Sequence, residues 1–252
     1  MKVFSVFGFT GSGKTTTIEN IIRELKMRKY SVGSVKEIHY EDFAIDMVGS
    51  NTYRHRMAGA ELVTARGYFE TDVLFPKKIS VEKMLSFYDQ EYVVLEGVTD
   101  YNLPKILTAK SIDEIEEKLD ESVFAISGRI SNDIDSYKGI PVINSLDNLD
   151  ELVDTIEEKV FVKLPDFESK CCSACGYDCR TLGIKILKGE AKRSDCILSE
   201  SNVSLFINDK KIDIVPFVQS ILSNTIQGIV SELDGYERGS KIRIEIGKED
   251  AK

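Results

Sequence analysis

The chain has 252 residues, 42% hydrophobic and 30% charged, with a formal net charge of -9. This length can bury a core for one large domain or two small ones, and the acidic balance argues against a nucleic-acid-binding protein, which normally presents a basic face. No apolar run approaches the roughly 20 residues that cross a bilayer, so we expect a cytoplasmic protein without a membrane or nucleic-acid partner.

Apolar runs alternate with helical patterns over the first 160 residues or so, which predicts an α/β fold with a mainly parallel sheet. A strand at residues 2–7 precedes a helix at 14–29, a strand at 31–35 and a polar, irregular stretch from 37 to 53. Further strands are predicted at 62–65, 73–75, 92–95, 105–107, 123–126 and 141–143, and further helices at 81–88, 113–119 and 148–159.

Residues 8–15, GFTGSGKT, match the phosphate-binding loop motif G-x-x-x-x-G-K-[ST] and lie between a predicted strand and a predicted helix. Glycines let backbone N–H groups surround the phosphates, while the lysine reaches the β- and γ-phosphates and the threonine hydroxyl ligates Mg²⁺. The sequence therefore predicts a P-loop NTPase fold that binds GTP or ATP. The candidate nucleotide-binding residues are Gly8, Thr10, Gly11, Ser12, Gly13, Lys14, Thr15 and Thr16.

A phosphate-binding loop also needs an acidic residue at the end of a nearby buried strand to complete the magnesium site. Glu96 ends the apolar run at 92–95 and precedes Gly97, and Asp100 is a weaker candidate. We predict that Thr15 and Glu96 hold the metal and that Lys14 and Glu96 are the catalytic residues.

The polar stretch after the second strand holds both histidines, His39 and His55. Arg54 and Arg56 flank the second histidine, and two guanidinium groups suit a phosphate or another anion. For an isolated R-H-R, a solvated charged helix start is the more common explanation. The spacing alone assigns no role to either histidine.

Composition changes after residue 162, and we place a domain boundary near Leu164, giving domains at 1–164 and 165–252. The second domain is predicted to be small, cysteine-rich and α+β. It has a helix at 180–189, strands at 203–207 and 211–214 around a turn at 208–210, a helix at 216–233 and a terminal strand at 242–246.

All five cysteines lie in this second domain, and Cys172, Cys175, Cys179 and Cys196 give four thiolates without a competing histidine. Four cysteine ligands suit a structural zinc or a 4Fe-4S cluster, with metal-free thiols as the third alternative. The spacing also resembles small four-iron domains with C-x-x-C-G-Y and a final G-E-A before the last cysteine. This chain has one residue fewer between the second and third cysteines.

The phosphate-binding loop, the segment from Val35 to His39, the R-H-R-M-A-G-A stretch at 54–60 and the strand that ends at Glu96 together resemble the MobB family. The resemblance covers roughly residues 2 to 160. It implies a GTP-binding adaptor with weak GTPase activity that acts with a MobA-like nucleotidyltransferase when a guanosine nucleotide is attached to molybdopterin. It also implies that Arg54, His55 and Arg56 contact the pterin phosphate or the partner.

The leading hypothesis is thus a GTP-binding adaptor in molybdenum or tungsten cofactor biosynthesis that uses GTP and Mg²⁺ and can form a homodimer. No N-K-x-D motif reads the base, and Ser127, Gly128 and Arg129 stand about where a base contact falls. The alternative is a P-loop ATPase that carries an iron-sulfur cluster or senses redox state. A small-molecule kinase is a third hypothesis.

Overall fold

The structure, a computed structural model, describes residues 1–40, 43–166, 172, 175–196, 203–207, 210–212, 214–237, 241–244 and 246. Contacts divide the chain into two units, each described by itself below. The first consists of Met1–Leu164 with Arg180–Arg193, and the second of Pro165–Cys179 with Ser194–Lys252. The predicted domain limits, 1–164 and 165–252, stay a prediction. Residues 180–193 pack with the first unit although they follow the proposed boundary.

A five-stranded sheet forms the centre of the first unit, and every neighbouring pair of its strands runs parallel. The predicted α/β fold with a mainly parallel sheet is therefore confirmed. In spatial order the strands are β2 (Val32–Lys36), β5 (Tyr92–Glu96), β1 (Lys2–Gly8), β6 (Lys105–Thr108) and β7 (Val123–Ser127). Because the strands are parallel, their carboxyl ends meet at one edge, where ligands bind in such sheets.

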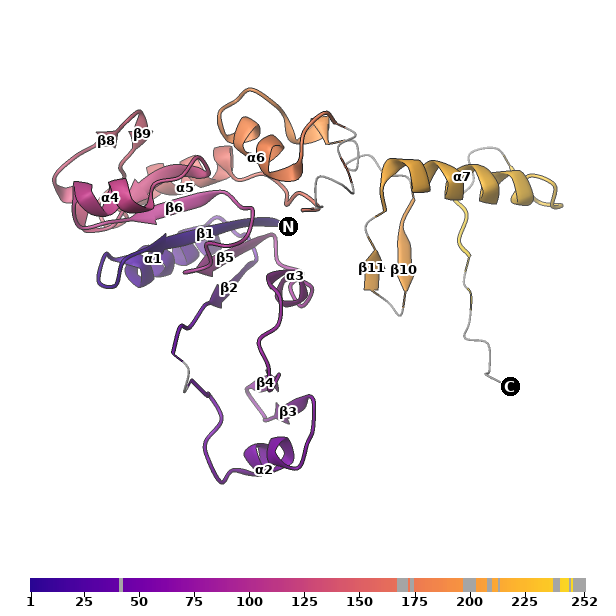
Figure 1. The fold of residues 1–252 in the computed structure, drawn as a ribbon, viewed down its shortest axis with the longest axis horizontal. Coiled ribbons are helices and arrows are strands. Elements are labelled where there is room, and N and C mark those ends of the chain that lie inside the picture. The colour runs from indigo at the N-terminus through magenta and orange to yellow at the C-terminus, as the bar shows by residue number, and fades with distance from the viewer. Residues whose placement is uncertain are drawn as a thin grey trace. The chain divides into compact units, whose positions relative to one another are not determined.

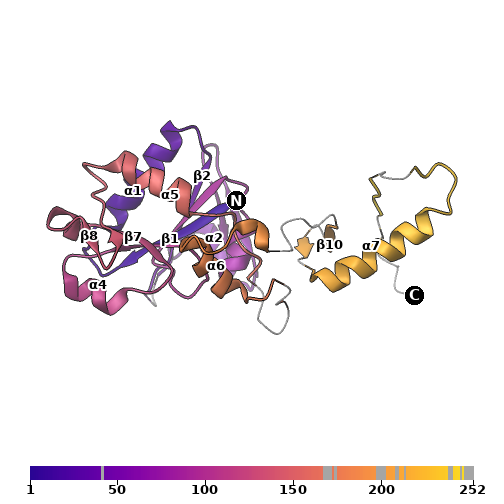
Figure 2. The same ribbon diagram turned by 90° about the horizontal axis from the view of Figure 1, so that it is seen from above.

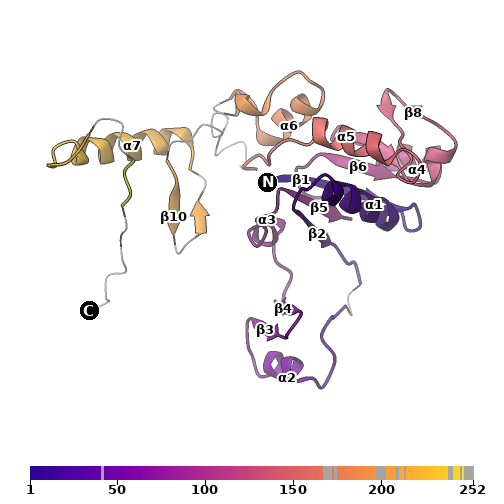
Figure 3. The same cartoon turned by 180° about the vertical axis from the view of Figure 1, so that it is seen from behind.

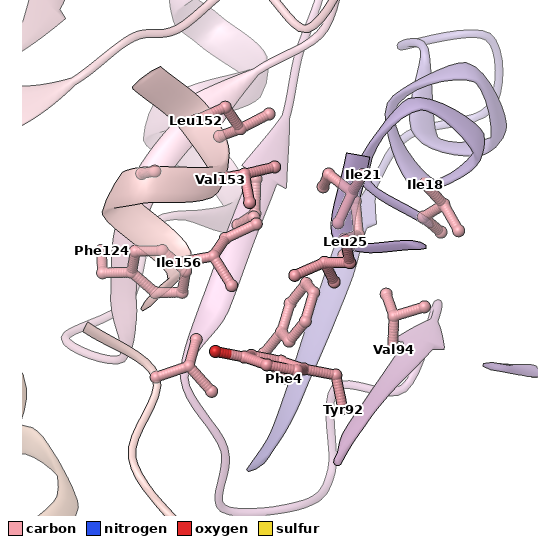
Figure 4. Close-up of a cluster of buried hydrophobic side chains, with 14 of the residues drawn as sticks. Phe4, Ile18, Ile21, Leu25, Tyr92, Val94, Phe124, Leu152, Val153 and Ile156 are labelled. Atoms are coloured by element: carbon pink, nitrogen blue, oxygen red, sulfur yellow. The ribbon is translucent and has the colours of Figure 1, made fainter. Parts of the chain in front are cut away.

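Helices cover both faces of the sheet, because successive side chains of each buried strand point to opposite faces. One face carries α1 (Lys14–Met27) and α5 (Leu149–Lys159), and the other carries α3 (Val81–Leu85) and α4 (Ile112–Lys118) (Figures 1 and 2). Figure 4 shows the α1–α5 face, where Phe4 and Val94 of the sheet meet Ile21 and Ile156 of the helices. This burial fixes α1, and with it the loop at its N-terminus.

An arm, defined here as residues 37–80, separates β2 from α3. It contains α2 (Asn51–Met57) and an antiparallel hairpin of β3 (Val63–Arg66) and β4 (Thr71–Leu74), all drawn apart from the sheet in Figures 1 and 3. No residue of α2 is buried. The two ends of the arm meet where Lys78 Nζ lies 2.7 Å from Glu37 Oε1.

The arm differs most from the sequence prediction. The strands predicted at 62–65 and 73–75 do not join the parallel sheet but pair with each other, and α2 lies partly within the stretch predicted to be irregular. The strand predicted at 141–143 is likewise reduced to β9 (Ile140–Pro141), which pairs antiparallel with β8 (Ser136–Tyr137). Few residues of α2, β3 and β4 are buried, so no long apolar run marks their ends. By contrast, Val142 and Ile143 are buried, and Val142 forms an isolated parallel bridge with Ile126 of β7.

The second unit contains a short antiparallel hairpin of β10 (Leu205–Ile207) and β11 (Lys210–Ile212), followed by α7 (Pro216–Val230). Helix α6 (Cys179–Leu187) begins at the last residue of this unit's first segment and continues in the first unit. The predicted turn at 208–210 lies largely outside the described residues, and residues 241–244 and 246 are not in a strand. Within the described chain no helix is both long and apolar enough to span a membrane.

Candidate nucleotide site

The phosphate-binding loop joins the carboxyl end of β1 to the first turn of α1. Gly8 and Gly13 hold φ values of 148° and 108°, in the region that side chains strongly disfavour. A Cβ atom on Gly8 would also lie 2.0 Å from the Thr108 carbonyl oxygen. Both glycines are therefore required by the backbone path itself, and Gly13 directly precedes the N-terminus of α1.

Strand β6 and the loop after β7 both contact Ser12 of the phosphate-binding loop and so hold the loop in place. The Ser12 side chain is buried; its hydroxyl donates to the Phe9 carbonyl oxygen at 2.8 Å and lies 2.7 Å from Thr108 Oγ1. The Arg129 amide donates to the Ser12 carbonyl oxygen at 3.1 Å. Ser12 thus holds the loop in shape without lining the cavity.

A cavity of about 960 Å³ opens above this loop, within the first unit. It brings together all the predicted nucleotide-binding residues of the loop except Ser12, with Glu96 beside them. Its other walls come from the end of β2, the start of the arm and the loops after β5, β7 and β9. These additional lining residues include Lys36, His39, Gly128, Arg129, Asn132, Asn144 and Leu146.

The Lys14 ammonium donates to the Gly8 and Phe9 carbonyl oxygens at 3.0 and 2.7 Å, so it lies over its own loop. Burial lowers the pKa of Lys14 most, and the charges of Lys36 and Lys110 lower it further, against an opposing effect of Glu96. Several positive charges thus converge on one cavity in an acidic chain. Such a field attracts a polyanion.

Thr15 and Glu96 meet at the carboxyl ends of β1 and β5. The Thr15 hydroxyl donates to Glu96 Oε1 at 3.2 Å, and Lys36 Nζ lies 2.6 Å from the same oxygen. A hydroxyl and a carboxylate are the hard oxygen donors that Mg²⁺ prefers. The two residues predicted to hold the metal therefore fit it in type and in place.

The R-H-R segment does not line this cavity, because it lies on α2 in the arm. Arg54 and His55 are exposed. Arg56 turns to Asp46, with Nε 3.8 Å from Oδ2, and its guanidinium lies 5.7 Å from the Tyr53 ring centroid. The three predicted anion-binding residues are thus separated from the loop, and Arg56 has a partner within the arm.

The cysteines belong to the second unit. Cys179 and Cys196 are buried, and Cys172 and Cys175 are half-buried. Four thiols are a suitable donor set for zinc or an iron-sulfur cluster. However, among the residues that the structure describes, no three His, Cys, Asp or Glu side chains gather as metal ligands. The described arrangement gives no support to the predicted metal centre.

Sequence reasoning missed Lys36, Asn132 and Asn144 in the cavity wall. Lys36 is the last residue of β2 and stands in register with Glu96 on the adjoining strand. A lysine at the carboxyl end of a strand is a candidate ligand-binding residue in a parallel sheet. However, a lysine at that position is equally consistent with a solvated side chain. The two asparagines follow β7 and β9 and carry no motif.

Comparison with known proteins agrees with this geometry. The model of a family described as molybdopterin guanine dinucleotide synthesis protein B, MobB, matches residues 3–128. A Haemophilus influenzae protein named molybdopterin-guanine dinucleotide biosynthesis adapter protein is 27% identical over 53% of this chain and 78% of its own length. A Methanocaldococcus jannaschii relative, provisionally given the same name, is 30% identical over 98% of this chain and 97% of its own length.

Solved structures show the same fold. The crystal structure of Bacillus subtilis MobB aligns with a TM-score of 0.55 at 20% identity, covering 65% of this chain and 100% of that one. The archaeal relative matches nearly the whole chain, so its likeness extends beyond the segment that the family model covers. Because the family model matches half of the chain and a relative that is 30% identical matches nearly all of it, the chain belongs to the MobB family.

Proposed function

We propose that this protein is a GTP-binding adaptor that assists attachment of a guanosine nucleotide to molybdopterin in molybdenum or tungsten cofactor biosynthesis. The cavity above the phosphate-binding loop is the observation that carries the proposal, because it unites Lys14, Thr15 and Glu96 in one wall. The adapter names of the relatives support this assignment over an iron-sulfur carrier.

The loop would hold the triphosphate through its backbone amides and the Lys14 ammonium. Mg²⁺ held by Thr15 and Glu96 would neutralise charge on the β- and γ-phosphates. Lys14 would stabilise the charge that develops when water attacks the terminal phosphorus. We propose only slow hydrolysis, because none of the described residues that line the cavity is a glutamine able to orient that water.

The base would lie toward Arg129, Asn132 and Asn144, which line the cavity at the loops after β7 and β9. Asn144 Nδ2 donates to Asn132 Oδ1 at 2.9 Å, and Asn144 Oδ1 accepts from the Leu146 amide at 2.8 Å. These fixed carboxamides offer donors and acceptors suited to a base edge. We propose that they favour guanine in place of the absent N-K-x-D motif.

The arm is the proposed surface for a MobA-like nucleotidyltransferase. Its side chains include large apolar groups that are fully exposed, Tyr68 and Phe69, as well as Val48 at 84%. Tyr68 and Phe69 are adjacent in the chain, and exposed apolar groups that lie together mark protein interaction sites. Arg54 and His55, exposed on the same arm, would contact the partner or the phosphate of molybdopterin. If the arm instead joined two copies of this chain in a homodimer, the isolated protein would have twice the mass of one chain.

The metal predicted at Cys172, Cys175, Cys179 and Cys196 stays a separate proposal, supported by the spacing of the four thiols. No step of the proposed function passes through it. Iron, acid-labile sulfide and zinc measured per chain after anaerobic purification test it directly.

Calorimetric titration with Mg²⁺–GTP and Mg²⁺–ATP tests the nucleotide assignment. We expect saturable GTP binding, weaker ATP binding, and loss of both in Lys14→Ala with an unchanged circular dichroism spectrum. Coprecipitation with a MobA-like nucleotidyltransferase, with and without molybdopterin, tests the adaptor role. A Lys14→Ala variant that titrates like the wild type would refute the site.

A further inference from the structure

Three side chains from three different elements meet at one carboxylate oxygen. Glu96 Oε1 accepts from the Thr15 hydroxyl of α1 at 3.2 Å and from the Lys36 ammonium of β2 at 2.6 Å. Only 13% of the Glu96 side chain is exposed, against 56% for Lys36. The carboxylate is therefore held in place, while the lysine reaches it from the open side of the cavity.

The sheet itself determines this meeting. Lys36 and Glu96 are register partners on the parallel strands β2 and β5, so their side chains stand on the same face. The pairing continues past the strand end, where the Glu37 amide donates to the Glu96 carbonyl oxygen at 2.9 Å. The backbone of Lys36 is thus fixed, and only its long side chain can change partner.

A Mg²⁺ ion held by Thr15 and Glu96 would place two positive charges next to the Lys36 ammonium. Like charges a few ångströms apart repel strongly in a partly enclosed site, so the ammonium would leave Glu96 Oε1. Lys36 still lines the cavity in which the phosphates would lie. With Mg²⁺ held by Thr15 and Glu96 beside the triphosphate, the terminal phosphate would be the anion nearest to the displaced ammonium.

We propose that Lys36 binds the terminal phosphate of the Mg²⁺–nucleotide complex and so distinguishes GTP from GDP. The proposal deepens the proposed function, on which it rests. The Lys14 ammonium lies over the loop and would bind the β-phosphate of either GTP or GDP. The Lys36 ammonium would have a phosphate partner only in the GTP complex. In the diphosphate complex its ammonium competes with the metal for Glu96.

The test compares the affinities of guanosine 5′-(β,γ-imido)triphosphate and GDP, each with Mg²⁺, for the full chain by calorimetry. Lys36→Met is expected to weaken binding of the triphosphate analogue by about tenfold to a hundredfold, the usual effect of one lost charge-assisted hydrogen bond, and to cause no loss of GDP affinity. Lys36→Arg keeps the charge and should retain the preference. Lys77→Met, which removes an exposed lysine outside the cavity, should match the wild type.

A magnesium titration of the GDP complex gives a second measurement. The GDP complex of Lys36→Met should be saturated at a lower Mg²⁺ concentration than that of the wild type, because no lysine ammonium competes with Mg²⁺ for the Glu96 oxygen. Equal losses of GDP and triphosphate affinity in Lys36→Met, or no loss of either, would overturn the role of Lys36. Failure of the wild type to bind either nucleotide would instead overturn the proposed function.

Discussion

Gly128 faces the carbonyl oxygen of Ser12 so closely that a Cβ atom at Gly128 would lie 2.2 Å from it. Gly128 has a φ of 86°, a conformation that glycine adopts readily and other residues do not. The loop after β7 therefore packs directly under the phosphate-binding loop. The shape of the nucleotide site depends on a glycine outside the P-loop motif.

Gly128→Ala is expected to reduce nucleotide affinity at least tenfold, because the methyl group must push the Ser12 carbonyl and with it the amides that surround the phosphates. Calorimetric titration with Mg²⁺–GTP measures the loss. Gly139→Ala is the matched control, since Gly139 has a similar φ of 81° but no atom within 4 Å of its added Cβ. Equal affinities in the two variants would show that the contact with Ser12 has no role.

Arg28 connects the C-terminal end of α1 to α5. Its Nε donates to Glu24 Oε1 at 2.7 Å, and its Nη1 donates to Asp154 at 2.5 Å and Glu157 at 3.3 Å. Arg28→Ala leaves the buried Glu24 carboxylate without this partner, so we expect a loss of about 1–3 kcal/mol in the free energy of unfolding. Urea denaturation measures it.

Arg23→Ala is the control for this prediction. Arg23 pairs with Glu19 at 3.5 Å, and both side chains are more than half exposed. A pair of this kind contributes about 0.5 kcal/mol or less. If both variants lose the same stability, the Arg28 contacts between α1 and α5 do not stabilise the fold.

Lys105 and Asp120 make stability depend on pH. Burial alone would raise the pKa of Asp120, but hydrogen bonds from Lys105 and Ser122 outweigh it and hold the pKa below its ordinary value of 3.8. The folded state therefore binds fewer protons near this pH than the unfolded state does. The resulting stabilisation is present above the ordinary pKa and is lost as pH falls through the lowered one.

Asp120→Asn should lower the free energy of unfolding by about 1–3 kcal/mol at pH 7, because the buried Lys105 ammonium loses its counter-charge. The difference from the wild type should narrow as the pH falls toward 3. Urea denaturation at a series of pH values measures both effects. Asp133→Asn, which changes an exposed carboxylate, serves as control. A difference that stays constant with pH would contradict the assignment.

Asp46 holds the start of α2 in the arm. Its Oδ1 accepts from the Ser50 and Thr52 hydroxyls, each at 2.7 Å, and these bonds lower the pKa of Asp46. Ser50 in turn caps the helix by accepting from the Tyr53 amide. Asp46→Ala should speed backbone amide exchange over residues 51–57 and leave GTP affinity unchanged, because the cavity walls do not include Asp46.

Hydrogen exchange read by mass spectrometry measures this change. Glu61→Ala, which removes an exposed acid from the same arm, is expected to leave the exchange of α2 as it is in the wild type. Unaltered exchange in Asp46→Ala would mean that the helix is held by other contacts.

The parallel sheet could be predicted from sequence because its strands are buried, and the phosphate-binding loop because it carries a motif. Strands β5 and β7 are continuous apolar runs, and the loop carries a motif whose chemistry needs each glycine. Glu96 was found by the same reasoning, since it ends a buried strand next to a glycine. Buried elements impose a pattern that one sequence can display.

The arm and the partner of Glu96 could not be predicted in the same way. Helix α2 buries no residue and β4 alternates between exposed and half-buried positions, so neither needs a recognisable apolar pattern. Lys36 acquires its role only through the register between β2 and β5, a contact 60 residues apart in the chain. Spacing within one strand carries no information about such a neighbour.

The ion pair between Glu37 and Lys78 closes the arm at its base, so the chain departs from the nucleotide domain and re-enters it at one point. A segment whose ends meet at one point can change in length without changing the order of the sheet strands. Only the first residues of the arm line the cavity, so substitutions in its outer part, from α2 to β4, leave the lining of the nucleotide site unchanged.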